Sequence, residues 1–187
     1  DQKVFKFKNI IQFKKIANKK SIFNVSWIDS HSLNNNEFKG LFYTGDYSKL
    51  NEKPAYFSYK NKKLNFWEKI FLSFYIKRYL FSKIINKLFY IYESNKKSIT
   101  FDEFFYPQDK WLNFNDCYKN GFFQIQFLVG EKKFDRIINK ISKFFQKFSI
   151  KSTFIIIKKI NEDGENMNYF GNGYSISMDF EKNDNFK

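Results

Sequence analysis

The sequence contains very few of the residues on which many catalytic and metal sites depend. Its 187 residues include one cysteine, Cys117, and one histidine, His31. This supply excludes an internal disulfide and a zinc site built from cysteine and histidine. Only His31 could serve a Ser-His-Asp or Cys-His system. Because it stands between Ser30 and Ser32, just after an apolar segment, we expect a solvated turn histidine rather than a general base.

Glycine and proline are also scarce, with seven and two residues. The glycines build neither a G-x-G-x-x-G nor a G-x-x-x-x-G-K-[ST] phosphate cradle. Long hydrophobic runs are missing too, because the most apolar uncharged stretch, Ile70 to Ile76, is bounded by Lys69 and Lys77. A transmembrane helix needs about 18 residues. The sequence therefore predicts no self-sufficient dinucleotide site and no transmembrane segment.

Aromatic residues and positive charge are abundant instead. Aromatic residues make up 22% of the chain, including 27 Phe, which supplies ample apolar surface for a folded core. The 33 Lys and Arg exceed the 19 Asp and Glu, so the net charge is +14. Such a field attracts anionic ligands, nucleic acid or acidic lipid. The joint excess of Lys, Asn, Ile, Phe and Tyr is also what an A/T-rich genome produces, so the charge has two explanations.

Hydrophobic periodicity predicts a mixed order of strands and helices. The second and third strands should form a hairpin, the central helix should break near Lys77, and polar segments over 51–65 and around 102–109 should be loops. We expect an α+β fold, an antiparallel sheet with helices packed on one face, in a single domain over 1–187. The expected strands span 4–8, 23–29, 38–44, 122–129, 154–160 and 174–180, and the expected helices span 9–17, 66–91 and 131–148.

Two of the expected helices carry further information. The helix over 131–148 is amphipathic, and its predicted core stripe consists of Phe134, Ile137, Ile138, Ile141, Phe144, Phe145 and Phe148. The segment over 66–91 is dense in Phe, Leu, Ile and Tyr, with Lys at irregular intervals. It is expected either to pack on the domain's own sheet or to lie as an amphipathic helix on a membrane surface.

Polar residues on two apolar strands are the candidate ligand contacts. Gln124 and Gln126 alternate with Phe and Ile, so both amides lie on one side of their strand. If that side faces a cleft, they offer donors and acceptors to a hydroxylated ligand such as a sugar; otherwise they are ordinary solvent-facing residues. Lys158 and Lys159 lie on a later strand. One of them is expected on the apolar or cleft side, where it could bind a phosphate or hydroxyl, unless the strand end frays and solvates both.

Several motifs, in order, resemble the substrate-binding region of flavin-dependent sugar oxidases of the decaprenylphosphoryl-β-D-ribose 2′-oxidase family, within the vanillyl-alcohol-oxidase type. The similarity covers roughly 23–181. The motifs are Val25-Ser26-Trp27-Ile28-Asp29, Tyr43-Thr44-Gly45-Asp46, Phe104-Phe105-Tyr106-Pro107-Gln108-Asp109, Gly121-Phe122-Phe123-Gln124-Ile125-Gln126-Phe127 and Gly173-Tyr174-Ser175-Ile176-Ser177-Met178-Asp179-Phe180.

The resemblance implies specific roles in a substrate pocket. Trp27 would be an aromatic wall, Phe105 and Tyr106 an aromatic pair, and Gln124, Gln126 and Lys159 a converging polar set. Ser177 stands where many family members have Cys, so reagents that act through a pocket thiol should not modify it. The lone thiol, Cys117, is expected to be partly buried by Phe114 and Tyr118. These site residues are Trp27, Phe105, Tyr106, Gln124, Gln126, Lys159 and Ser177.

The resemblance also implies a cofactor and partners. In that family a flavin domain precedes this region, so FAD would be bound mainly by a domain absent from this chain. The sequence starts within a strand, as a cut within a larger protein would, and it ends before the family's catalytic Lys. The isolated chain is expected to be inactive. The substrate would be a sugar carrying a CH-OH group to be oxidised, with an anionic, polyprenyl-phosphate-linked sugar of cell-wall polysaccharide biosynthesis as one form. We expect a cytoplasmic protein, with peripheral membrane attachment as an alternative. A basic nucleic-acid-binding or ribosome-associated module is the rival function, disfavoured by the dispersed lysines.

Overall fold

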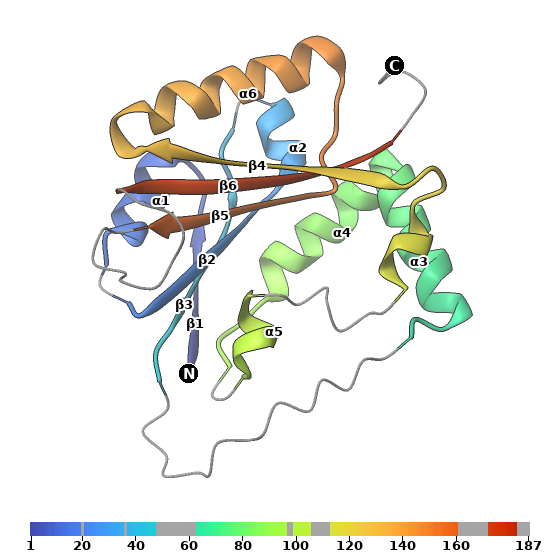
Figure 1. Cartoon of the computed structure of the whole chain (residues 1–187), viewed down its shortest axis with the longest axis horizontal. Helices are drawn as coiled ribbons and strands as arrows, with labels where there is room; N and C mark the ends of the chain where they lie inside the picture. The colour runs from blue at the N-terminus through green and yellow to red at the C-terminus, as the bar shows by residue number, and fades with distance from the viewer. Residues whose placement is uncertain are drawn as a thin grey trace.

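The computed structural model describes residues 1–19, 21–35, 37–47, 63–96, 99–105, 113–160 and 172–182. Six strands form one antiparallel sheet in the order β1-β3-β2-β5-β6-β4 (Figure 1). The predicted α+β class and antiparallel sheet are confirmed. The elements are β1 (Gln2–Phe7), α1 (Ile10–Ala17), β2 (Phe23–Ile28), α2 (Ser30–Asn34), β3 (Gly40–Gly45), α3 (Phe66–Lys77), α4 (Tyr79–Tyr92), α5 (Phe101–Phe105), η1 (Phe114–Cys117), β4 (Phe122–Gly130), η2 (Glu131–Lys133), α6 (Phe134–Phe148), β5 (Phe154–Ile160) and β6 (Gly173–Glu181).

The larger core lies between the sheet and helices α1, α2 and α6; we call this side the α6 face (Figure 1). Its centre is Phe13 of α1, which is fully buried. The rings of Phe7, Phe38 and Phe134 lie 5.2, 5.3 and 5.4 Å from the Phe13 ring. Such edge and stacked contacts add to the stability gained by apolar burial. Asn9 caps α1 by accepting from the Gln12 amide, so the helix begins where it can deliver Phe13 to this core.

Helices also lie against the opposite side of the sheet, which we call the α4 face (Figure 1). Tyr90 of α4 and Phe104 of α5 pack with Trp27, Leu41 and Tyr43 of the central strands. The sequence predicted helices on one face of the sheet, and α1 and α6 do lie together on the α6 face. It did not predict the second layer of helices on the α4 face. The short helix α5 was expected to be part of a loop. Its five residues are too few to show a helical period. Reciprocal hydrogen bonds between Thr100 and Glu103 begin the helix, and Phe104 packs it against the sheet.

Local signals predicted the remaining boundaries well. β2 and β3 pair antiparallel as the expected hairpin, with α2 in the connection. The central helical segment breaks at Arg78, whose φ and ψ of −100° and 109° are extended, one residue after the expected position. A capping box between Asn65 and Glu68 begins α3. The predicted loop over 51–65 falls almost entirely outside the described residues.

The buried stripe of α6 differs from the predicted one. Phe134, Ile138 and Phe145 are buried as expected, but Phe144 and Phe148 are half exposed. Ser142 takes a buried place instead, because α6 packs against α2 as well as the sheet and the Ser142 hydroxyl donates to the Leu33 carbonyl at 2.5 Å. Over the described residues, no helix is long and apolar enough to cross a membrane.

Candidate ligand-binding face of the sheet

The sequence-predicted polar residues meet on the α4 face in a row that crosses four strands. Gln126 of β4 pairs with Ser177 of β6, and Ser177 pairs on its other side with Ile156 of β5. Ile156 in turn pairs with Trp27 of β2. Residues paired across a sheet present their side chains on the same side. Three of the site residues therefore share one line, although they are up to 150 positions apart in the chain.

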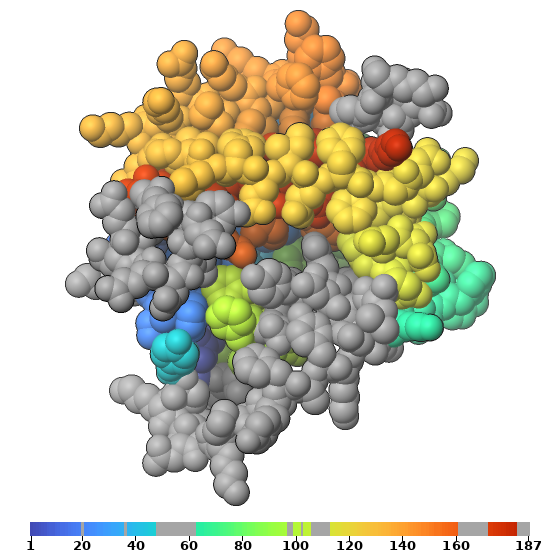
Figure 2. Space-filling model, in the orientation of Figure 1, coloured from blue at the N-terminus to red at the C-terminus, as the bar shows by residue number. Residues whose placement is uncertain are grey.

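A second row of polar contacts runs beside the first. Gln124 donates to the Asp179 carboxylate at 2.7 Å, and Gln126 donates to the Ser175 hydroxyl at 3.2 Å. Asp179 and Ser175 are buried while both glutamines are exposed. Burial raises the pKa of Asp179, and the hydrogen bond from Gln124 partly opposes this shift. The β6 side chains thus fix the amide groups of β4, which lies at the surface below α6 (Figure 2).

Lys158 supplies a positive charge beside the polar rows of this face. Its partner in the sheet is Ser175, and its ammonium nitrogen lies 5.0 Å from the centre of the Phe105 ring. Burial lowers the pKa of Lys158. The α4 face therefore combines amides, hydroxyls and one partly buried cation, which are the groups that bind hydroxyl and phosphate oxygens. Among the described residues, no group of three or more His, Cys, Asp or Glu is placed to hold a metal ion.

Lys159, the lysine predicted for this site, lies on the other side of the sheet. Its ammonium group forms an ion pair with Glu131 at 2.7 Å and donates to the Asn18 side chain at 2.5 Å. It also lies 5.8 Å from the centre of the Tyr174 ring in the main core. The predicted convergence of Lys159 with the two glutamines is therefore wrong. Lys158 takes that place, because the registry of β5 with β6 puts odd-numbered β5 side chains on the α6 face.

The aromatic candidates are placed at one end of the row. Trp27 is buried and packs edge-on against Phe89 of α4, with ring centres 5.0 Å apart, so it forms the floor of the face rather than an open wall. Phe105 packs against Phe101 and Phe104 within α5 and against Phe23 of β2. Phe105 is close to the site through Lys158. Tyr106 lies outside the described residues.

Ser177 and Cys117 lie in different environments. Ser177 is partly exposed at the centre of the polar row. Cys117 is buried with Phe114 and Tyr118, as predicted, and burial raises the pKa of its thiol. A thiol with a raised pKa is a weak nucleophile at neutral pH. The chain therefore offers no reactive sulfur among the described residues of this face.

His31 is buried rather than solvated, which corrects the sequence prediction. Its Nε2 lies 2.9 Å from the Ser82 hydroxyl, and that hydroxyl also donates to the Tyr79 carbonyl at 2.9 Å. Because the single proton of the Ser82 hydroxyl is used in the bond to Tyr79, the Ser82 oxygen accepts a hydrogen bond from the N–H at Nε2 of the neutral imidazole. Nδ1 of His31 is buried with no partner among the described residues. A neighbouring hydrogen bond joins Asn86 of α4 to the Asp29 carboxylate at 2.7 Å. These contacts fasten α4 to the start of α2.

Acid is expected to destabilise the fold through His31. Burial lowers the pKa of His31 from 6.5 to about 4, with Lys83 and Lys151 acting in the same direction and Asp29 opposing them. The unfolded chain therefore binds the proton first, so stability is intact above about pH 6.5 and falls as the pH drops toward 4. The loss should reach about 3 kcal/mol. Urea unfolding of the wild type and His31→Gln at pH 7 and 4.5 measures it; an identical pH dependence in both would contradict this assignment.

Comparison with known proteins assigns no family to this chain. No protein-family model matches the chain, and no curated protein matches it.

Proposed function

We propose that this chain is the substrate-binding part of a FAD-linked oxidoreductase that oxidises a CH-OH group of a sugar-like, polyprenyl-phosphate-linked substrate. The row from Gln126 through Ser177 to Trp27 carries the proposal. It spans three strand-to-strand steps, or about 14 Å, which is long enough for one sugar ring and its phosphate. The motif resemblance supports the same proposal, since three of its seven positions, Gln126, Ser177 and Trp27, fall on this row.

The chemical match is between the face and a hydroxylated anion. Gln124 and Gln126 are held by β6 yet exposed, so their amides are pre-oriented toward a ligand. Lys158 provides a charge for a phosphate oxygen, and Phe105 beside it provides an apolar surface for a sugar ring or a prenyl group. A site that combines a few fixed polar groups with apolar walls is typical of small-molecule recognition.

The described residues do not fit the flavin's own binding needs. All five described glycines lie at strand ends, at positions 40, 45, 121, 130 and 173, and no two share a loop. Gly40 and Gly173 are needed for strand packing, because a Cβ there would collide with the carbonyl oxygens of Trp27 and Val129. A pyrophosphate cradle of consecutive amides is thus missing from these residues. Another domain would therefore bind the cofactor, and this chain would bind the substrate.

A binding experiment tests this function. The chain is titrated with a short-chain prenylphosphoryl pentose by calorimetry, and the side-chain amide signals of Gln124 and Gln126 are followed by NMR. We expect saturable binding that shifts both signals, and about tenfold weaker binding in Gln126→Leu through the lost hydrogen bonds. Gln146→Leu, which removes a glutamine from α6, is the matched control and should bind as the wild type does. Absence of binding, or equal loss in both variants, would contradict the proposal, as would displacement of the sugar by single-stranded nucleic acid with a steep salt dependence.

A further inference from the structure

Helix α4 exposes its apolar stripe and buries a polar one. Leu80, Ile84, Leu88 and Ile91 follow the spacing of one helix face, and all four are exposed, Leu80 by 73% and Ile84 by 58%. The buried residues of this helix are Ser82, Asn86 and Tyr90. An amphipathic helix of a globular domain normally shows the opposite arrangement. The apolar stripe of α4 is therefore directed away from the domain's own core.

Specific hydrogen bonds fix this orientation. Ser82 is bonded to His31, and Asn86 receives a bond from the Tyr75 hydroxyl at 2.8 Å while donating to Asp29 at 2.7 Å. Rotating α4 to bury its leucines would break these buried bonds, each of which is costly to leave unmade. The exposure of the stripe is thus a property of the fold rather than loose packing.

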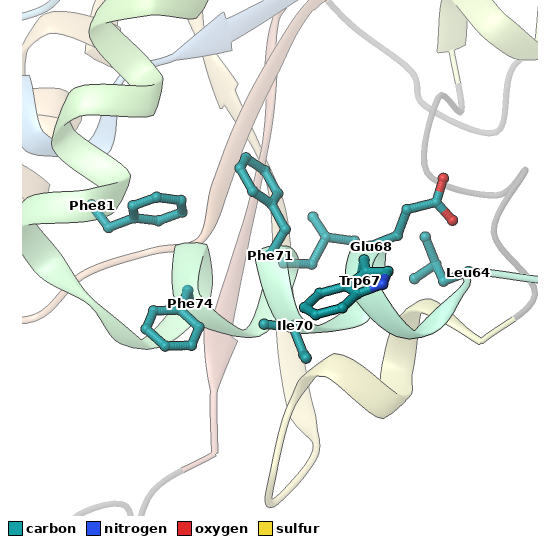
Figure 3. Close-up of a pocket in the computed structure, with 8 residues that line it drawn as sticks. Leu64, Trp67, Glu68, Ile70, Phe71, Phe74 and Phe81 are labelled. Carbon is teal, nitrogen blue, oxygen red and sulfur yellow. The ribbon is translucent and has the colours of Figure 1, made fainter.

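Helix α3 extends the apolar surface. Phe66, Trp67, Phe71 and Phe74 are exposed, with Trp67 at 74%. Trp67, Phe71 and Phe74 of α3 and Phe81 of α4 line a hollow of about 640 Å³. Figure 3 shows these side chains. Among the described residues, Glu68 is the only charged one that lines the hollow. We call the exposed apolar residues of both helices, together with this hollow, the α3–α4 surface. Soluble monomers rarely expose large apolar patches without a partner.

The charged residues of α3 and α4 are basic apart from Glu68, and one of them, Lys69, pairs with Asp116. Lys77 of α3 and Lys83 and Lys87 of α4 are exposed, as is Arg78 at the break between the two helices. The one acidic residue of these helices, Glu68, is engaged in the capping box of α3. Lys6 adds a further cation at the end of α4, where it donates to the Ile91 carbonyl at 2.6 Å. An apolar surface ringed by cations complements acyl chains below a layer of anionic headgroups.

We propose that the α3–α4 surface docks this protein onto an anionic lipid membrane. The two helices, of 12 and 14 residues, lie in the plane of the interface with their apolar side chains among the acyl chains. Lys77, Arg78, Lys83 and Lys87 contact the lipid phosphates. Trp67 and Tyr79 sit at the level of the headgroups, as aromatic side chains with a polar edge prefer. This docking does not require a bound sugar.

Vesicle flotation tests the docking. The wild-type chain should float with vesicles of about 70% phosphatidylcholine and about 30% phosphatidylglycerol. With pure phosphatidylcholine vesicles, the floating fraction should be at least about tenfold smaller. Leu80→Ser/Ile84→Ser/Leu88→Ser should lose more than tenfold in partitioning, since it removes three inserting side chains. Lys83→Glu/Lys87→Glu should lose a similar factor on anionic vesicles only. The Trp67 emission should shift to shorter wavelength on binding, and Trp67→Phe should abolish that shift.

The α6 side offers a matched control. Ile11, Phe144 and Phe148 are exposed apolar residues of α1 and α6, and their triple replacement by Ser should leave flotation unchanged. Circular dichroism confirms that each variant is folded. Equal flotation of the wild type and the α4 triple variant would overturn the proposal. Failure of the wild type to bind anionic vesicles would also overturn it. So would a wild-type dimer that does not bind lipid and that becomes a monomer in the α4 triple variant, because a second copy of the chain would then cover the surface.

Discussion

Replacing Asp29 with alanine is expected to lower the free energy of unfolding by about 3 kcal/mol. The Asp29 carboxylate accepts from the Asn86 side chain at 2.7 Å and from the His31 backbone at 3.1 Å, where it caps α2. The variant therefore leaves two buried donors without an acceptor and removes an N-cap, which alone contributes about 1 kcal/mol. Since these bonds join α4 to the sheet, the loss should appear in global unfolding by urea.

The control for this variant is a carboxylate in an exposed pair. Asp135 of α6 lies 3.2 Å from the Lys14 ammonium, and both side chains are well exposed to solvent. Asp135→Ala should therefore change stability by less than about 1 kcal/mol. If Asp29→Ala costs no more than Asp135→Ala, the Asp29 network does not fasten α4. The α4 stripe would then have no fixed direction, and its exposure would need another cause.

Replacing Lys158 with methionine is expected to weaken binding of the prenylphosphoryl pentose about thirtyfold, or about 2 kcal/mol, because a charge-assisted contact to the phosphate is lost. Lys159→Met should leave that affinity unchanged, since its ammonium group lies on the α6 face with Glu131 and Asn18. It should instead lower stability by breaking the ion pair between the buried Lys159 side chain and the half-exposed Glu131. Calorimetric titration and urea unfolding of both variants separate the two effects.

Lys158 and Lys159 are neighbours in the sequence, so the affinities of their two variants can be compared directly. Both variants remove the same charge from the same strand, so a change in net charge alone affects them equally. An affinity loss in Lys159→Met but not in Lys158→Met would place the ligand on the α6 face. Such a result would reject the site described above.

Much of the fold could be read from local patterns. The strand over 122–129 alternates in period two, and the helix break near Lys77 is marked by consecutive charges; both elements were found almost where they were predicted. That Gln124 and Gln126 share one side of a strand is also a local property. The buried environment of Cys117 was predicted as well, because aromatic residues flank it in the sequence.

The site could be predicted only in part, and Lys158 shows why. Period two says that Lys158 and Lys159 point to opposite sides, but not which side carries the glutamines. That choice depends on the pairing of β5 with β6 and of β6 with β4, which are contacts between segments distant in sequence. His31 was misjudged for a related reason, since its partner Ser82 is 51 residues away.

The sequence by itself determined three things: the classes of site that this chain cannot build, the α+β order of its elements, and the presence of two amides on one side of a strand. Each of these depends only on composition or on the pattern of neighbouring residues. Only the tertiary structure decided which lysine joins those amides, that Ser177 and Trp27 complete their row, and that α4 turns its leucines outward. The physical reason is the same in each case. Strand registry and buried hydrogen bonds between remote segments, such as Asn86 with Asp29, select one of several arrangements that the local pattern allows equally.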